Sequence, residues 1–455
     1  MLLMMIGKFW RCNSCGAIIK TKIGVGYQKE TNYKFECERC HQEITLRFII
    51  KEYTDKLGRT NYKDIWIPDG ISKSKSNKFD FCFTSHPDFP TRTSDVYSFP
   101  FIDALNNRDE TDILQRQLRQ VFWHELSMKK AKNLKMIYRN YSLGDFENFK
   151  KGIIAFQKGS TEFDSKILSA LLPGELPLNN NMDKLSALSR VLDACFFPIV
   201  VSKNHFELYH YFESYIADLN QTEYQNYNEF VDFLVNNNYL TDIQNKCFEY
   251  IFNFLDLSED FSPVIFEWDP ENPDATFPSD ANINNNISFD KIKSFSVDGF
   301  ELLSKSLVII IGLINIKHRH NYDSINYDPR ERNKKPFKGG LIEFNAIANA
   351  PKFKLLSEEN KFDKWINPVI DSKLRNDIGH FGYTIDSNKG YITYYTNKEK
   401  TKSNTITYGE YLFRCIRLLV RVYQVNILVK MIMYQHLIKN TMDEDATQVS
   451  ADIKI

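Results

Sequence analysis

The sequence lacks both an overall charge and a hydrophobic run long enough to span a membrane. Its 58 Lys and Arg residues are matched by 58 Asp and Glu residues, so the formal net charge is zero. The longest apolar run, residues 307–316, is too short to cross a bilayer. The apolar start, residues 1–6, is far too short for the hydrophobic region of a secretory signal. We therefore expect no membrane segment and a cytoplasmic protein.

The zero net charge conceals an uneven distribution along the chain. Residues 1–80 contain 15 Lys and Arg against 9 Asp and Glu, and residues 301–455 contain 24 against 17. Residues 141–300 are acidic, with 10 Lys and Arg against 25 Asp and Glu. A phosphate-rich partner would be drawn to the basic ends and repelled by the middle. Alternatively, the acidic segment docks against the basic ones and neutralises them.

Cysteines are few, and their spacing separates them into two kinds. Four of the eight form two CxxC pairs. The other four are scattered among apolar neighbours: Cys82, Cys195, Cys247 and Cys415. A metal-type cluster beside isolated thiols indicates a reducing compartment rather than a disulfide framework.

The two CxxC pairs predict one structural zinc ion in an N-terminal zinc ribbon, residues 1–66. Each pair forms a tight turn that offers two thiolates, and two such turns complete a tetrahedral site. The four ligands would be Cys12, Cys15, Cys37 and Cys40. Cysteine fills every ligand position, so we expect a structural ion and no catalytic metal. His41 is an alternative ligand, but four cysteines make it redundant, and we expect it on the surface.

The spacer between the two CxxC pairs suits a β-hairpin. Strand-like residues 18–19 and 33–35 flank Gly24 and Gly26, which allow the chain to turn. Residues 44–53 form a further strand-like run that would extend the same sheet.

Composition indicates a folded, mainly α protein of more than one domain. A chain of 455 residues is too long to fold around one ordinary hydrophobic core. Hydrophobic residues at 43% and aromatic residues at 14% exclude bulk disorder. Helical periodicity begins near residue 111. After the zinc ribbon we predict an irregular connector (67–110), an acidic helical domain (111–268), a linker (269–290), a C-terminal helical bundle with a β-hairpin insertion (291–440) and a disordered tail (441–455).

Aromatic residues recur at helical spacing in the acidic segment, as in Phe206, Tyr209 and Phe212. Such stripes more often pack helices together than line a ligand site. His205 and His210 lie among them, and we expect both in the core or on the surface.

The C-terminal third contains at least three predicted helices. Residues 299–316 form a strongly apolar helix. A short helix begins at Asn367 and Pro368, an N-cap and a first-turn proline, and ends at Gly379. A β-hairpin follows over residues 383–395, and a capping box at 407–410 opens a long amphipathic helix to about residue 439. The buried stripe of the short helix would consist of Ile370, Leu374 and Ile378.

Arg375, Asn376 and His380 lie at the end of that short helix. Gly379 can turn the chain and bring His380 back toward Arg375. The arrangement resembles the HEPN ribonucleases, whose motif is Arg, a polar residue that is often Asn, several spacers and then His. In that family the motif also ends a helix and precedes another long helix. The resemblance covers about residues 295–440.

The spacing alone is weak, because Arg119 and His124 have the same separation. An uninterrupted helix there would place those two side chains about 140° apart around the helix axis. No glycine lies between Arg119 and His124 to break that helix. The alternative to catalysis is a structural role for the C-terminal motif. Asp371 and Arg375 would then form a surface ion pair, and His380 would end a helix without a catalytic function.

The resemblance implies a metal-independent RNA endonuclease with Arg375, Asn376 and His380 as its catalytic residues. It also implies an RNA substrate and a homodimer through the C-terminal domain, and it suggests a microbial toxin or anti-phage effector. The zinc ribbon or the acidic middle would receive a trigger or regulatory partner. Arg414, Arg417 and Arg421 either grip flanking phosphates or form a solvated face. The alternatives are a non-catalytic module that binds nucleic acid or protein, and a transcription-associated zinc-ribbon adaptor.

Overall fold

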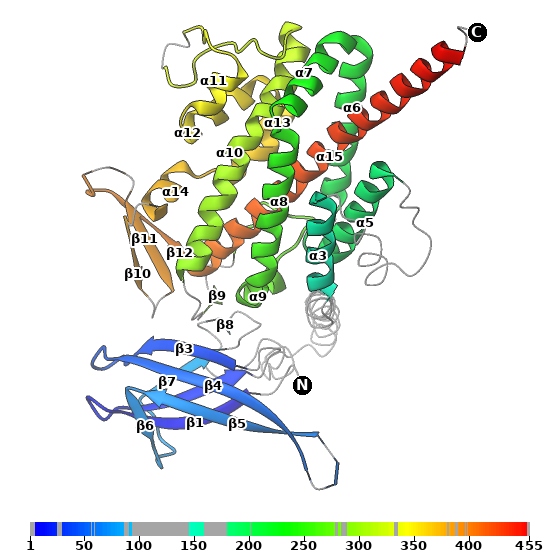
Figure 1. The fold of residues 1–455 in the computed structure, drawn as a ribbon. Helices are drawn as coiled ribbons and strands as arrows, with labels where there is room; N and C mark the ends of the chain where they lie inside the picture. Colours follow the sequence, from blue (N-terminus) through cyan, green and yellow to red (C-terminus); the bar gives the residue numbers. More distant parts are fainter. Residues whose placement is uncertain are drawn as a thin grey trace, which may run out of the picture.

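The computed structural model comprises an N-terminal β part and a larger helical body (Figure 1). It describes residues 5–24, 30–55, 57–58, 60–85, 91–92, 145–158, 180–200, 202–277, 281–283, 289–331, 335–379, 382–386, 390–395, 397 and 399–452. A mainly α fold with small sheets agrees with the prediction from sequence.

Two sheets build the N-terminal part. The first has the order β6-β1-β2-β7 and contains β1 (Met5–Cys12), β2 (Ile18–Gly24), β6 (Ile71–Lys73) and β7 (Phe81–Ser85). The second has the order β3-β4-β5 and contains β3 (Glu30–Glu36), β4 (Glu43–Thr54) and β5 (Thr60–Asp69). Alternate residues of both sheets point into one shared core, which includes Trp10, Ile19 and Phe48.

Two predictions for this part are wrong. The strands between the CxxC pairs do not form a hairpin, because β2 and β3 belong to different sheets. The β structure also does not stop at residue 66. β6 pairs with β1, and β7 pairs in parallel with β2, so part of the predicted connector completes the first sheet.

Twelve α-helices are described in the helical body. They are α3 (Asp145–Gln157), α5 (Asn181–Val200), α6 (Lys203–Thr222), α7 (Tyr224–Asn236), α8 (Tyr239–Asp256), α9 (Ser258–Glu267), α10 (Phe289–Arg319), α11 (Leu341–Ala346), α12 (Asn349–Lys352), α13 (Asn360–Ile366), α14 (Ser372–Gly379) and α15 (Tyr408–Asp452). Two 3-10 helices, η2 (Phe353–Glu358) and η3 (Asn367–Val369), lie between them.

One hydrophobic core joins these helices. α8, α10 and α15 pack against one another at its centre, and the buried cluster extends from Ile153 to Ile432. The predicted acidic domain and the predicted C-terminal domain therefore share a core. The stripe at residues 205–212 is only partly in it, because Phe212 and His205 are buried whereas Phe206 and His210 are exposed.

The predicted linker, residues 269–290, is packed where the structure describes it. The backbone carbonyls of Pro273 and Ala275 accept hydrogen bonds from Arg417 on α15. Phe277 is buried, and its N–H donates to the Glu410 carboxylate at 2.8 Å. Farther on, β9 (Ala281–Asn282) pairs with β8 (Thr91–Arg92). This segment is held against α15 rather than free.

The C-terminal hairpin is confirmed and gains a third strand. β10 (Tyr383–Asp386), β11 (Tyr391–Tyr395) and β12 (Ser403–Thr407) form a sheet in that order. The Thr407 side chain accepts the Glu410 N–H at 3.0 Å and so caps α15, which confirms the first half of the predicted capping box. The Glu410 carboxylate, its other half, accepts the Phe277 N–H. α15 then continues through Asp452, which corrects the expected end near residue 439 and the expected disorder beyond it.

α10 is the helix predicted from the apolar run, and it is longer than predicted. Its 31 residues make it long and apolar enough to cross a membrane, but 89% of its most apolar stretch is buried inside the protein. This burial is that of a core helix in a soluble protein.

Candidate functional site

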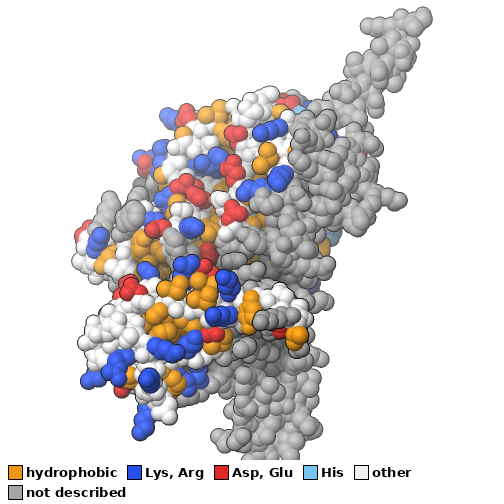
Figure 2. All heavy atoms as spheres, turned by 60° about the horizontal axis from the view of Figure 1, so that its bottom comes forward, with side chains coloured by type: hydrophobic (Ala, Val, Ile, Leu, Met, Phe, Trp, Pro, Cys, Tyr) orange, Lys and Arg blue, Asp and Glu red, His pale blue; other side chains and the backbone are white. Residues whose placement is uncertain are grey.

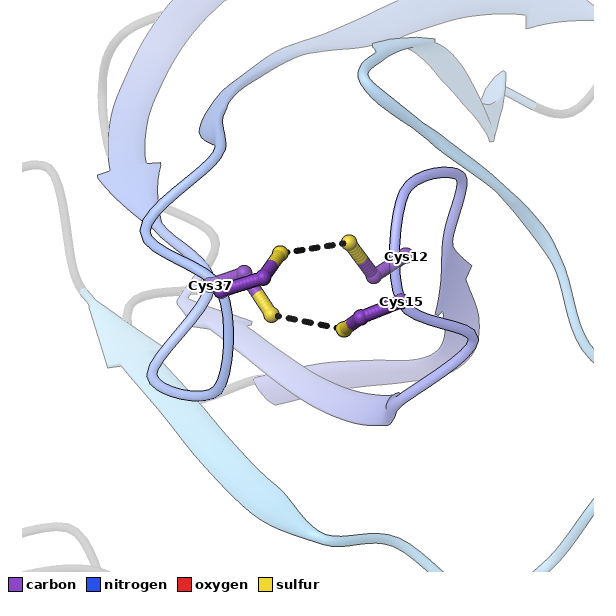
Figure 3. A group of neighbouring side chains, drawn as sticks. Cys12, Cys15 and Cys37 are labelled. Atoms are coloured by element: carbon purple, nitrogen blue, oxygen red, sulfur yellow. Dashed lines mark hydrogen bonds between the residues drawn. The ribbon is translucent and has the colours of Figure 1, made fainter.

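The predicted zinc ligands come together at two matching turns. Cys12 and Cys15 lie on the turn between β1 and β2, and Cys37 and Cys40 lie on the turn between β3 and β4 (Figure 3). In each turn the first cysteine accepts the N–H four residues on: Gly16 N to Cys12 O at 3.0 Å, and His41 N to Cys37 O at 2.8 Å. Two similar turns from two sheets therefore face each other.

The distances between the sulfurs fit a tetrahedral metal site. Cys12 Sγ lies 3.6 Å from Cys40 Sγ, and Cys15 Sγ lies 3.5 Å from Cys37 Sγ. All four sulfurs lie within 4.8 Å of one another. Zn–S bonds of about 2.3 Å in a tetrahedron place sulfurs about 3.8 Å apart. The residues thus fit a single zinc ion, which would cross-link the two sheets.

The residue that follows each CxxC pair has a left-handed backbone conformation. Gly16 and His41 both have positive φ angles, 74° and 60°, at the residue after each CxxC pair. Glycine suits this left-handed conformation best. The His41 side chain is 76% exposed and lies 3.6 Å from Glu36, which agrees with the expected surface position.

Burial and the turn backbone act in opposite directions on the thiols. Burial disfavours the Cys12 thiolate, but the N–H groups of Cys15 and Ser14 outweigh it and lower the pKa of Cys12 to about 7. Burial raises the pKa of Cys37 to about 12. A bound cation would favour the thiolate at all four cysteines.

The second predicted site lies on α14. This helix does not begin at Asn367 and Pro368, which form the separate turn η3. Asp371 caps it, because its carboxylate accepts the Leu374 N–H at 2.9 Å. α14 ends at Gly379, as predicted, and Leu374 and Ile378 are buried.

Arg375 reaches from α14 to α10. One of its guanidinium N–H groups donates to the Glu301 carboxylate, and another donates to Asn376 Oδ1 at 3.2 Å. The guanidinium carbon lies 5.5 Å from the centre of the Phe300 ring. The Arg375 side chain is 21% exposed, and its buried Nε has no hydrogen-bond partner among the described residues. Asn376 is exposed.

Three other residues named from the motif pattern, His380, Arg119 and His124, lie outside the described residues. His380 follows directly on Gly379, the last residue of α14. The ion pair considered between Asp371 and Arg375 is replaced by others. Asp371 pairs with Arg414 at 2.7 Å, whereas Arg375 pairs with Glu301.

The three arginines of α15 serve contacts within the chain. Arg414 pairs with Asp371, and Arg417 pairs with Glu410 at 3.2 Å. Arg421 is only 8% exposed. A solvated face is therefore wrong for Arg421.

The outer face of the first sheet combines aromatic and basic side chains. Lys20 Nζ lies 5.6 Å from the Phe9 ring centre and 5.2 Å from the Phe79 ring centre. Alternation along β1 and β2 places Arg11 and Lys22 on the same face. Figure 2 shows Lys and Arg side chains gathered among hydrophobic ones over the N-terminal β part. We use the name β1–β2 face for five side chains: Phe9, Arg11, Lys20, Lys22 and Phe79.

The chain matches no protein-family model, no curated protein and no solved structure at a significant level.

Proposed function

We propose that the protein is a metal-independent RNA endonuclease of the HEPN type, with Arg375, Asn376 and His380 as its catalytic residues. The observation that supports it is the arrangement of residues along α14. There a partly exposed arginine contacts an exposed asparagine, and the helix ends one residue before the histidine.

The residue types suit transfer of the phosphate within RNA. The 2′-oxygen of the ribose forms a bond to the neighbouring phosphorus, and the bond from phosphorus to the 5′-oxygen breaks. A histidine that titrates near neutral pH can take the 2′-hydroxyl proton or protonate the leaving 5′-oxygen. The products are a cyclic phosphate and a 5′-hydroxyl end.

Arg375 would stabilise the charge that develops on the phosphate. Its guanidinium is already oriented by Glu301 and Asn376, so little reorganisation is needed when substrate binds.

The resemblance further suggests a homodimer that forms the site between two copies, and a role as a microbial toxin or anti-phage effector. The zinc-binding part or the acidic helices would then receive the trigger or a regulatory partner. These assignments rest on the family resemblance.

An RNA-degradation assay on the purified protein tests the proposal. His380→Ala should lose cleavage by about 10²–10⁴-fold, the contribution typical of general acid–base catalysis. Arg375→Ala should lose about 10²–10³-fold, the cost typical of removing a donor that stabilises developing charge. Both variants should keep the wild-type circular-dichroism spectrum, because Arg375 is not among the buried residues of α14 and His380 is a polar residue beyond the end of that helix.

Arg119→Ala and His124→Ala are matched controls with the same spacing, and both should remain active. Cleavage should persist in EDTA as long as the N-terminal part stays folded. A requirement for added magnesium, or normal cleavage by His380→Ala, would overturn the HEPN nuclease proposal.

The β1–β2 face favours a second function, a module that binds single-stranded nucleic acid without cutting it. Aromatic rings beside basic side chains provide stacking surfaces and phosphate contacts for single strands. Under this alternative, RNA binds but is not cleaved, and Phe9→Ala and Lys20→Ala weaken binding in a fluorescence-anisotropy assay. Lys63→Ala, an exposed lysine on β5, is the control.

A further inference from the structure

A cavity of about 280 Å³ lies between α6, α13, α15 and the segment that follows α9. Its size is near the lower end of small-molecule sites, which begin at about 300 Å³. It shares no lining residue with the much smaller cavity, about 20 Å³, beside Arg375. It is therefore separate from the proposed catalytic turn.

Arg421 supplies a buried positive charge to this cavity. One of its N–H groups donates to Gln424 Oε1 at 3.2 Å, and its Nε is buried without a hydrogen-bond partner in the described part of the chain. No described carboxylate lies within ion-pair distance of it, and Asp274, which also lines the cavity, acts on it only through longer-range attraction. Burial lowers the pKa of Arg421 to about 10, so it stays protonated at neutral pH. A buried charge without a close ion-pair partner is unfavourable, and an anionic ligand would add a close counter-charge to the longer-range one of the exposed Asp274.

Other polar groups around the cavity support an anion over a cation. Lys361 and Lys364 on α13 line it and are exposed. Glu207 and Asp274 also line it, but both are exposed, whereas Arg421 is buried. The positive charge thus lies at the buried end, where electrostatic interactions are strongest.

Two tryptophans give the cavity an apolar wall. Trp365 Nε1 donates to Gln424 Oε1 at 2.7 Å, and Trp268 Nε1 donates to the Ile199 carbonyl at 2.7 Å. Because both indole N–H groups already have acceptors, these residues offer mainly ring surface to a ligand. His205, also in the lining, is buried, and its Nδ1 has no partner among the described residues.

We propose that this cavity binds a small phosphate-bearing molecule with a planar ring, a mononucleotide by chemical class. Its phosphate would receive hydrogen bonds from Arg421 and Lys364, and its ring would pack against Trp268 and Trp365. The proposal does not depend on RNA cleavage.

Isothermal titration calorimetry with AMP, GMP, CMP and UMP tests it on the full chain. Inorganic phosphate and the matching nucleosides are titrated beside them. At least one nucleotide should bind with a Kd below about 1 mM. Arg421→Met should weaken that binding about tenfold or more, because it removes the charged donors. Lys364→Ala, at an exposed position, should weaken it less.

A melting curve separates a binding role of Arg421 from a purely structural one. Arg421→Met should melt no lower than the wild type, because an apolar side chain replaces a buried charge that has no close ion-pair partner. Arg190→Met, the same change at an exposed position of α5, should leave nucleotide binding unaltered. The proposal is overturned if no nucleotide binds, if Arg421→Met binds as well as the wild type, or if phosphate alone binds as tightly as every nucleotide.

Discussion

The guanidinium of Arg375 lies between two acceptors on different parts of the chain. Asn376 is its sequence neighbour, whereas Glu301 comes from α10. A flat group with donors at fixed angles can serve both acceptors at once. A lysine at this position would offer one ammonium at the end of a flexible chain. The shape of the side chain therefore matters as much as its charge.

Arg375→Lys should accordingly fail almost as badly as Arg375→Ala in RNA cleavage, with a loss of about 10²-fold or more. Glu301→Gln is the comparison, because it keeps an oxygen acceptor for the guanidinium and should stay within about tenfold of wild type. Initial rates on a labelled RNA measure both. Wild-type activity in Arg375→Lys would show that only a positive charge is required, contrary to the proposed fork of contacts.

The residues of the candidate sites differ in how well the sequence reveals them. The four cysteines are predictable because each CxxC pair is a local turn. Glu301 is not, because its contact with Arg375 joins residues 74 positions apart. Arg421 also escapes, since only the packing of α6 and α13 against α15 shows that it is buried. Its spacing with Arg414 and Arg417 suggested an exposed face instead.

At the level of elements, local signals located most segments but placed some ends wrongly. The hairpin at β10 and β11 and the Thr407 cap are confirmed because turn and cap residues act over a few positions. The predicted start of α14 is too early, because Asn367 and Pro368 are residues that commonly begin a helix. They begin only η3, after which Ile370 is extended, and Asp371 caps the next helix.

Strand pairing was the least predictable feature. β2 and β3 are consecutive in the sequence, yet they belong to different sheets. β7 pairs directly with β2, although all three strands of the second sheet lie between them in the sequence. Such pairings depend on contacts that are distant in sequence. The consequence is that the two cysteine turns come from different sheets, which makes the metal a link between them.

Loss of that link should unfold the N-terminal part. We expect metal analysis of the wild type to find about one zinc per chain. Cys37→Ser should lose the ion and the near-ultraviolet signal of Trp10 and Trp66, whose rings pack 5.8 Å apart in this part. Cys82→Ser, a thiol on β7 outside the cluster, is the matched control and should keep both. Metal-free protein with an intact N-terminal fold would contradict the structural role.

Across the whole molecule, the charge segregation is partly resolved by packing. Asp232 of the acidic segment pairs with Lys439 at 3.6 Å, and Glu223 pairs with His320 at 2.6 Å. These contacts, together with the shared core, agree with docking of the acidic segment on the basic C-terminal one. The composition shows how the charges are distributed along the chain, but it does not reveal that the acidic and the C-terminal segments share one hydrophobic core.

The same packing changes the argument for a dimer. A long amphipathic helix such as α15 can offer its apolar stripe to a second copy, but its residues from Tyr411 to Ile432 are largely buried in the chain's own core. That stripe is therefore not available to a second copy. The proposal of a dimer now rests on the family resemblance alone, and an interface would have to use other surfaces of the C-terminal region.

Light scattering coupled to gel filtration tests this at the scale of the assembly. We expect a species of twice the 53.4 kDa chain mass at micromolar concentration. If two copies form each site, specific activity should fall as the protein is diluted below the dimer dissociation constant, because association follows mass action. Arg414→Ala should leave the mass unchanged, since that side chain bonds within its own chain. A monomer at every concentration, with RNA cleavage retained per chain, would show that Arg375 and His380 act within one copy and that the composite site is wrong.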